Sequence, residues 1–189
     1  MRPRLTAGYF DELYAGDPDP WGFETSAYEQ AKYAATIDAL EGRRYATALE
    51  IGCSIGVLTA RLAERCDALL AVDAAQAATE SASERLATVR NVTVERRELP
   101  EDFPAGPFEL IVCSEVLYYW DRETLEAALP AIADSLAPGG RLVAVHYRPP
   151  STIDPLTGDA VHALLRERLA LGHVESEVND QFRIDVFGA

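Results

Sequence analysis

From Tyr45 onward, short apolar runs alternate with segments of helical periodicity, and this alternation restricts the fold of the chain more than any other feature. The apolar runs cover residues 46–51, 68–72, 92–94, 108–113 and 141–145. All but the third are nearly continuous, which is typical of parallel strands that helices cover on both faces. Strands that alternate regularly with helices predict right-handed βαβ units in an open, doubly wound α/β sheet.

The C-terminal part of the chain departs from this alternation. A helix is expected at about 159–170, and two strand-like segments follow near 173–178 and 182–187. The connection between these segments is too short for a helix, so we expect them to pair as an antiparallel hairpin at the edge of the sheet. The sequence therefore predicts a doubly wound, mostly parallel, Rossmann-like sheet of about seven strands.

The first forty residues have a different character and predict helices. Residues 9–15 fit a short helix that a Gly-Asp-Pro-Asp-Pro cluster ends. Ser26-Ala27-Tyr28-Glu29 matches a capping box, in which the serine accepts an amide hydrogen bond and the glutamate reaches back, and a helix should follow it. We therefore expect one domain over residues 1–189, with an N-terminal helical lid at 1–42 and the Rossmann-like core at 43–189.

Two further signals lie between the fourth and fifth predicted strands. The spacing of apolar residues over 125–136 predicts a helix that Asp121 caps and Pro130 interrupts. The Ala137-Pro138-Gly139-Gly140 segment that follows is expected to turn the chain back into the fifth strand.

The first apolar run leads directly into a glycine-containing loop, Gly52-Cys53-Ser54-Ile55-Gly56. Glycine lets the backbone turn tightly and approach a ligand closely. Asp73 ends the second apolar run, at about the 20-residue offset of the acid that binds the ribose hydroxyls of a nucleotide. A plainer alternative for Asp73 is that its carboxylate caps the next helix.

The loop does not have the form that a dinucleotide requires. The dinucleotide fingerprint is GxGxxG, in which the glycines accommodate a pyrophosphate, whereas this loop is GxxxG with Ser54 inside it. Glu50, two residues before the first glycine, would repel a phosphate. An acidic residue at this position suits the cationic methionine portion of S-adenosylmethionine, which makes an NAD-dependent oxidoreductase the less favoured alternative.

With these features, the chain resembles the class I S-adenosylmethionine-dependent methyltransferases. More narrowly, it resembles the nodulation protein S (NodS-like) group. Four segments carry the narrower resemblance: Asp17 to Phe23 (DPDPWGF), Tyr28 to Tyr33 (YEQAKY), Glu115 to Tyr119 (EVLYY) and Leu136 to Gly140 (LAPGG). The resemblance implies S-adenosyl-L-methionine as the cofactor, and the founding member of the group N-methylates a deacetylated amino-sugar oligomer.

The resemblance also implies where a bound cofactor would lie. The glycine-containing loop would follow the cofactor, Asp73 would hold its ribose, and Lys32 of the lid would lie near its carboxylate. The segment after the third strand would meet the adenine, and the segment after the fourth would flank the methionine moiety. Ser54 replaces a glycine that is usual in the loop, and Glu98 stands where an aspartate is usual. The full predicted set is Trp21, Lys32, Glu50, Gly52, Cys53, Ser54, Gly56, Asp73, Ala74, Glu98, Leu99, Ser114 and Glu115.

The acceptor of the methyl group is expected beside the loops that follow the fourth and fifth strands. His146 ends the fifth strand, and its ordinary pKa near 6.5 lets it accept a proton at neutral pH, although it could instead be a structural histidine. Tyr118 and Tyr119 offer flat faces for a sugar ring or a cation, or they pack the lid against the sheet. The negative charge of Glu115 favours a basic amine as the acceptor. His162, early in the last helix, could face the same cleft.

The composition of the chain restricts the classes of molecule that it is expected to bind. The chain has 17 Lys and Arg against 31 Asp and Glu, a net charge of −14, which repels phosphate backbones and anionic lipids. We therefore expect neither nucleic acid nor membrane as a partner, and no stretch approaches the roughly 20 apolar residues of a membrane span. The three cysteines, Cys53, Cys66 and Cys113, lack metal-binding spacing and predict free thiols in the cytoplasm and no metal site.

The sequence predicts a methyltransferase that transfers a methyl group from S-adenosylmethionine to an amine of a small molecule, with an amino sugar as the candidate acceptor. Two alternatives keep the same fold: transfer to a hydroxyl group, and a catalytically silent protein that binds the cofactor.

Overall fold

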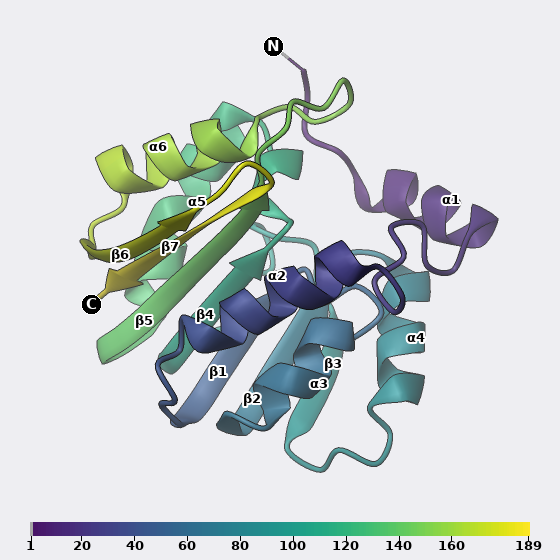
Figure 1. The fold of residues 1–189 in the computed structure, drawn as a ribbon, viewed down its shortest axis with the longest axis horizontal. Helices are drawn as coiled ribbons and strands as arrows, with labels where there is room; N and C mark the ends of the chain where they lie inside the picture. The colour runs from purple at the N-terminus through teal and green to yellow at the C-terminus, as the bar shows by residue number, and fades with distance from the viewer. Residues whose placement is uncertain (1) are drawn as a thin grey trace. The chain divides into compact units, whose positions relative to one another are not determined.

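The computed structural model describes residues 2–189, and Met1, the first residue of the predicted lid, lies outside the described residues. The described residues form six α-helices, one short 3₁₀ helix and seven strands (Figure 1). They divide into two compact units. One unit is Thr6–Glu98, and the other is Leu99–Ala189 together with the N-terminal residues up to Leu5. None of the helices in residues 2–189 combines the length and the apolar character that crossing a membrane requires.

Three parallel strands form the centre of the unit Thr6–Glu98. Their order is β3-β2-β1, where β1 is Tyr45–Ile51, β2 is Cys66–Asp73 and β3 is Val92–Arg96. The helices α3 (Val57–Ala63) and α4 (Gln76–Arg85) connect the strands and pack against β2. Ile51 pairs with Val72, so the carboxyl ends of β1 and β2 lie side by side. The three strands confirm the first three predicted runs.

The N-terminal helices of this unit are α1 (Ala7–Gly16) and α2 (Ala27–Asp38), and both predicted helices are confirmed. α1 packs against α4, and α2 packs against α3. The Ser26 hydroxyl caps α2 by accepting a hydrogen bond from the Glu29 amide, as the capping box predicts. The Glu29 carboxylate, however, pairs with the ammonium group of Lys32 one turn further along the helix.

Four strands form the sheet of the unit Leu99–Ala189, in the order β4-β5-β7-β6. β4 (Phe108–Ser114) and β5 (Leu136–Tyr147) are parallel. β7 (Phe182–Gly188) runs antiparallel to β5, and β6 (Gly172–Val178) runs antiparallel to β7 at the outer edge. The predicted C-terminal hairpin is confirmed, and the structure adds that its second strand, not its first, pairs with β5.

The predicted turn at residues 137–140 is an irregularity within β5 rather than a turn that precedes it. Phe108 of β4 pairs with Leu136, whereas Leu110 pairs with Arg141. Four residues on β5 therefore stand opposite a single residue on β4, and Gly139 takes a positive φ of 77°. The strand begins at Leu136 because both sides of the irregularity hydrogen-bond to β4, which a sequence pattern alone cannot show.

Two helices and a 3₁₀ helix complete this unit. α5 (Arg122–Asp134) begins after Asp121, whose Oδ1 accepts a hydrogen bond of 2.9 Å from the Thr124 amide, and the predicted cap is confirmed. α6 (Gly158–Arg168) lies over β5 and β7 and also packs against α5 (Figure 1). The 3₁₀ helix η1 (Leu117–Tyr119) follows β4 and contacts α6.

Candidate functional site

The glycine-containing loop leaves β1 through a series of left-handed backbone conformations. Gly52, Ser54 and Gly56 have φ values of 80°, 49° and 80°. The amides of Gly52 and Cys53 both donate to the Val72 carbonyl, at 2.8 and 3.0 Å. These two hydrogen bonds hold the start of the loop against the end of β2. A tight loop of this kind presents backbone atoms to a ligand without side chains in between.

Ser54 is the one residue with a side chain among the three left-handed positions. A non-glycine residue is strained there, by roughly 1–2 kcal/mol. Two contacts hold it in place: its amide donates to Asp73 Oδ2 at 2.9 Å, and its hydroxyl shares a short hydrogen bond with the Tyr14 phenol of α1. The Tyr14 ring in turn meets Trp21 edge-on, and Trp21 stacks on Phe23 at 5.3 Å between centroids. The predicted lid residue Trp21 is thus part of an aromatic group that contacts the loop.

Asp73 lies at the tip of β2 and accepts backbone hydrogen bonds through both oxygens. Oδ2 accepts from the Ser54 amide, and Oδ1 accepts from the Ala75 amide at 3.0 Å. Burial raises the pKa of the carboxyl, and the backbone hydrogen bonds oppose that rise. A carboxylate offers about four acceptor positions, so Asp73 can hold the loop and the start of α4 and still accept from a further donor.

Glu50 is a buried carboxyl group with an unsatisfied oxygen. Only 1% of the residue is exposed, and among the described residues Oε2 has no hydrogen-bond partner. Burial raises the pKa of Glu50 to about 8, the Thr59 hydroxyl lowers it, and the negative charge of Asp73 raises it further. An unsatisfied buried carboxyl group is costly unless a cation or a donor meets it. The residues present therefore fit the positively charged part of the predicted cofactor.

Lys32, the other predicted residue of the lid, is also buried. Its ammonium group lies 3.0 Å from the Glu29 carboxylate and 4.8 Å from the centre of the Tyr28 ring. These contacts stabilise a lysine side chain of which only 1% is exposed. The carboxylate of a bound cofactor as a further partner of Lys32 stays a prediction.

In the unit Leu99–Ala189, the predicted acceptor residues lie on the turn after β4. This segment, Glu115 to Trp120, is called the 115–120 turn below. Glu115 has a positive φ of 56°, and its amide donates to the Val145 carbonyl at 2.8 Å. The Tyr118 hydroxyl donates a short hydrogen bond to Glu115 Oε2, and the Tyr118 ring meets Tyr119 edge-on at 4.6 Å. Burial and the adjacent Glu115 carboxylate raise the pKa of Tyr118, so the phenol stays protonated and donates.

The remaining predicted residues divide between the two units. Ala74 follows Asp73 and is half-buried, and Glu98 is exposed at the end of the unit Thr6–Glu98. Leu99 and Ser114 are buried in the other unit, Ser114 as the last residue of β4. The structure thus brings the loop residues, Glu50 and Asp73 together within one unit, and the residues of the 115–120 turn together within the other.

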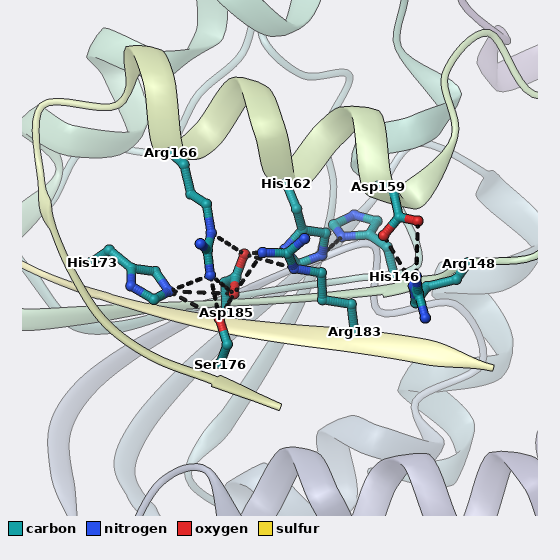
Figure 2. Close-up of polar contacts among 9 residues, drawn as sticks. All are labelled: His146, Arg148, Asp159, His162, Arg166, His173, Ser176, Arg183 and Asp185. Carbon is teal, nitrogen blue, oxygen red and sulfur yellow. Dashed lines mark hydrogen bonds and ion pairs between the residues drawn. The ribbon is translucent and has the colours of Figure 1, made fainter. Parts of the chain in front are cut away.

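His146 is fully buried near the end of β5. Its Nε2 accepts a hydrogen bond of 3.2 Å from the Leu117 amide, and its Nδ1 lies 3.1 Å from Nε2 of His162. His162 Nδ1 lies 2.8 Å from Asp185 Oδ2 (Figure 2). The ring nitrogen that a general base would use is therefore occupied by a backbone amide. This geometry favours the alternative of a structural histidine, although its partner in the loop is an amide and not a carbonyl.

Sequence reasoning did not single out Tyr14 or Asp185. Tyr14 carries no sequence signal beyond its place in a helix. Asp185 does carry one, because a carboxylate between the apolar residues Ile184 and Val186 of a predicted strand must find partners if it is buried. That signal indicates a buried polar contact, but it does not say with which residue.

Comparison with known proteins matches residues 11–171 of the chain to the family model for Nodulation protein S (NodS). Nodulation protein S from Bradyrhizobium diazoefficiens is 35% identical over 129 residues, which cover 66% of this chain and 61% of that protein. The corresponding protein from Azorhizobium caulinodans is 34% identical over 127 residues, with the same coverage. The chain therefore spans about three fifths of the length of these curated relatives.

Solved structures extend the similarity to nearly the whole chain. The crystal structure of the N-methyltransferase NodS from Bradyrhizobium japonicum in complex with S-adenosyl-L-homocysteine matches with a TM-score of 0.85 at 26% identity, over 97% of this chain and 98% of that one. A protein from Pseudomonas syringae matches with a TM-score of 0.77 at 40% identity, over 87% of this chain and all of that one. These similarities confirm the predicted Rossmann-like methyltransferase fold.

Proposed function

The chain belongs to the nodulation protein S family, and from this membership we propose that it is an S-adenosylmethionine-dependent N-methyltransferase of a small amine. The observation that carries the proposal is the Gly52–Gly56 loop, bent onto Asp73, with the buried carboxyl group of Glu50 at its start. A relative of the same fold holds S-adenosyl-L-homocysteine, the product that methyl transfer leaves.

In this proposal each group of the unit Thr6–Glu98 has a distinct binding role. The backbone of the loop follows the nucleoside, and Asp73 accepts hydrogen bonds from the ribose hydroxyls. The carboxylate of Glu50 pairs with the positively charged methionine portion, which supplies its unsatisfied oxygen with a partner. The cofactor contributes a methyl group on a sulfonium, and alignment of donor and acceptor supplies most of the acceleration of such a displacement.

The acceptor side of the proposal lies on the 115–120 turn. An amine attacks through its lone pair, so the protonated amine must first release a proton to solvent. The neutral amine then forms the new N–C bond as the S–CH₃ bond breaks, and the methylated ammonium product releases its extra proton to solvent. Glu115 attracts the amine in its protonated form, and with Tyr118 it orients the nitrogen by hydrogen bonds. The half-exposed Tyr119 ring offers a flat face for a sugar ring or a cation. An amino sugar is the acceptor that fits both features.

The first experiment is calorimetric titration of the protein with S-adenosylhomocysteine and, separately, with NADH. We expect binding of S-adenosylhomocysteine alone. Binding of NADH alone would replace the proposal with an oxidoreductase. Methylation assays then compare deacetylated amino-sugar oligomers, simple amines and the corresponding neutral sugars. Transfer to hydroxyl groups only would defeat the preference for an amine, and binding without any transfer would indicate a silent member of the fold.

Replacement of Asp73 tests whether this residue binds the ribose. Replacement of Asp73 by Ala should lower the affinity for S-adenosylhomocysteine by about 100-fold, because the ribose and the Ser54 amide lose their acceptor together. Asp73→Asn keeps one acceptor oxygen and should fall between Asp73→Ala and the wild type. Calorimetry measures all three affinities, and an Asp73→Ala protein that binds as tightly as the wild type rules the assignment out.

A further inference from the structure

A connected row of buried polar side chains lies beneath α6 in the unit Leu99–Ala189 (Figure 2). It runs from the Leu117 amide through His146 and His162 to Asp185, with separations of 3.2, 3.1 and 2.8 Å. None of the three side chains is exposed to solvent. They are called the histidine network below. The proposed binding of cofactor and acceptor uses none of its hydrogen bonds directly.

The hydrogen bonds of the network can point in only one direction. A backbone N–H can only donate, so Nε2 of His146 must carry a lone pair where it meets the Leu117 amide. The proton of a neutral His146 is then on Nδ1, and it is donated to Nε2 of His162. The proton of a neutral His162 is in turn on Nδ1, and it is donated to Asp185. Both imidazoles are thereby fixed as the Nδ1–H tautomer.

Asp185 anchors the far end of the network as an acceptor. Its carboxylate receives hydrogen bonds from Arg166 at 3.0 and 3.1 Å and from Arg183 at 3.1 Å, together with the Ser176 hydroxyl (Figure 2). Burial alone would raise the pKa of Asp185, but the hydrogen bonds from His162, Arg166 and Ser176 hold it well below its usual range. An ionised carboxylate only accepts, so the proton of His162 must face it.

The near end of the network holds the 115–120 turn. The first amides of a helix have no acceptor within the helix, and Leu117 is the first residue of η1. His146 therefore caps η1 from a strand that lies about thirty residues later in the chain. Of the other backbone bonds to this turn, the Leu156 amide reaches the Tyr118 carbonyl at 3.2 Å and the Leu5 amide reaches the Tyr119 carbonyl at 2.9 Å. Those two bonds join backbone groups, whereas the bond of Leu117 depends on the protonation of a side chain.

We propose that His146 and His162 are positioning residues, held as neutral Nδ1–H tautomers by Asp185, which fix the turn that presents Glu115 and Tyr118 to the acceptor amine. This inference rests on the proposed function for its consequence in catalysis. The geometry of the network itself does not depend on that function. His146 thus acts through the Leu117 amide and exchanges no proton with the substrate.

The direction of the network also makes the turn sensitive to acid. A second proton on either imidazole would place two donors opposite each other, at the Leu117 amide or between the two rings. Burial lowers the pKa of His162 and Arg183 lowers it further, while the hydrogen bond and charge of Asp185 raise it. Charged and titratable groups surround the network as a whole. Asp159, Arg183 and Asp185 act on His162, Tyr118 lies against His146, and Arg166 and His173 contact Asp185. Because the net effect lowers the pKa of His162, protonation of the network should require a pH below 6.5, the ordinary value for histidine.

The first test observes the tautomers directly. Two-bond ¹H–¹⁵N correlation spectra of the full-length protein should show both His146 and His162 protonated on Nδ1 between about pH 6.5 and 8. His173→Gln is the matched control, because His173 contacts the same carboxylate but lies outside the row, and it should leave both tautomers unchanged. A proton on Nε2 of His146, or an imidazolium at neutral pH, would overturn the proposal.

The second test separates positioning from packing through two replacements of His146. His146→Leu fills the space without an acceptor, whereas His146→Gln places a carbonyl oxygen near the position of Nε2. His146→Leu should lose about 10- to 100-fold in kcat/KM for the amine, with the affinity for S-adenosylhomocysteine unchanged within about two-fold. His146→Gln should retain activity within about five-fold of the wild type. Equal losses in both variants, or no loss in either, would contradict the proposal.

The third test uses pH. His162→Gln keeps an acceptor for His146 but does not titrate. At saturating cofactor, amines of different pKa identify the part of the acidic limb of the kcat/KM profile that comes from the amine itself, and the remaining part should shift to lower pH or vanish in His162→Gln. A remaining part that is unchanged in His162→Gln would count against the network. If the wild type transfers no methyl group to any amine, the proposed function fails, and amide exchange at Leu117 still tests the network. Exchange should be at least about ten-fold faster in His146→Leu than in His146→Gln, and equal rates would reject the proposal.

Discussion

Glu50 is a single residue whose burial links binding to stability. The pKa of its carboxyl group rises from an ordinary value of 4.5 to about 8 in the folded protein. Between these two pH values the folded state therefore holds a proton that the unfolded state has released. Stability falls with rising pH wherever the folded state binds more protons, so Glu50 lowers the free energy of unfolding progressively from about pH 4.5 to about pH 8.

Replacement of Glu50 by Gln should remove this penalty. At pH 8 we expect the variant to be more stable than the wild type by on the order of 2 kcal/mol, and the difference should shrink toward pH 5. Urea denaturation at the two pH values measures it. The same variant should bind S-adenosylmethionine at least about ten-fold more weakly, because the paired charge is gone. A variant that is no more stable at pH 8, or that binds the cofactor equally well, would show that Glu50 is not a buried partner for a cation.

At the scale of elements, the position of α6 decides whether the histidine network forms. α6 begins at Gly158, which lies directly against the end of β5. A Cβ atom at this position would be 2.2 Å from the Tyr147 carbonyl oxygen and 3.1 Å from Cβ of His146. The missing side chain therefore lets α6 approach β5 closely enough for His162 to reach His146. Glycine is required here by close approach, since no positive φ is involved.

Gly158→Ala should accordingly push α6 away from β5. We expect a loss of about 1–3 kcal/mol in the free energy of unfolding, together with loss of the Nδ1–H signature of His146. Gly8→Ala is the matched control, because a Cβ atom at Gly8 of α1 meets only the Thr6 hydroxyl oxygen at 3.9 Å. That control should be neutral or stabilising by up to about 1 kcal/mol, as alanine is the better helix former. Equal stability of the two variants would show that α6 adapts without strain.

At the scale of the whole molecule, the charge of −14 acts on every partner that approaches. A field of this sign raises the local concentration of cations and repels anions, and dissolved salt screens it. A protonated amine acceptor gains from the field, whereas S-adenosylhomocysteine, which has no net charge at neutral pH, gains little. Charge therefore favours the same class of acceptor that Glu115 favours locally.

Dissolved salt should affect the binding of these two ligands differently. Between about 20 mM and about 300 mM NaCl, we expect the KM for an amine acceptor to rise several-fold, while the affinity for S-adenosylhomocysteine changes by less than about two-fold. Initial-rate kinetics at saturating cofactor and calorimetry measure the two quantities. A KM that is independent of salt would mean that the acceptor is bound without help from the net charge, as a neutral hydroxyl acceptor would be.

Several features of this protein follow from the sequence alone because their causes are local. The period of the apolar residues distinguishes strands from helices, and the N-caps at Ser26 and Asp121 depend on residues only three positions apart. The glycine loop and Asp73 end adjacent parallel strands, so their meeting follows from strand order. The connection between the last two strands is too short for a helix, so it likewise predicts an antiparallel hairpin. It does not indicate which strand of the hairpin pairs with β5.

Only the tertiary structure decided which polar groups meet in the interior. His146, His162 and Asp185 lie on three different elements, and a shift of α6 by part of a turn would separate them. The bond from Tyr14 to Ser54, which are forty residues apart, was decided in the same way. A buried polar group must find a partner, which the sequence does indicate, but the identity of the partner depends on packing among elements that are distant in the chain.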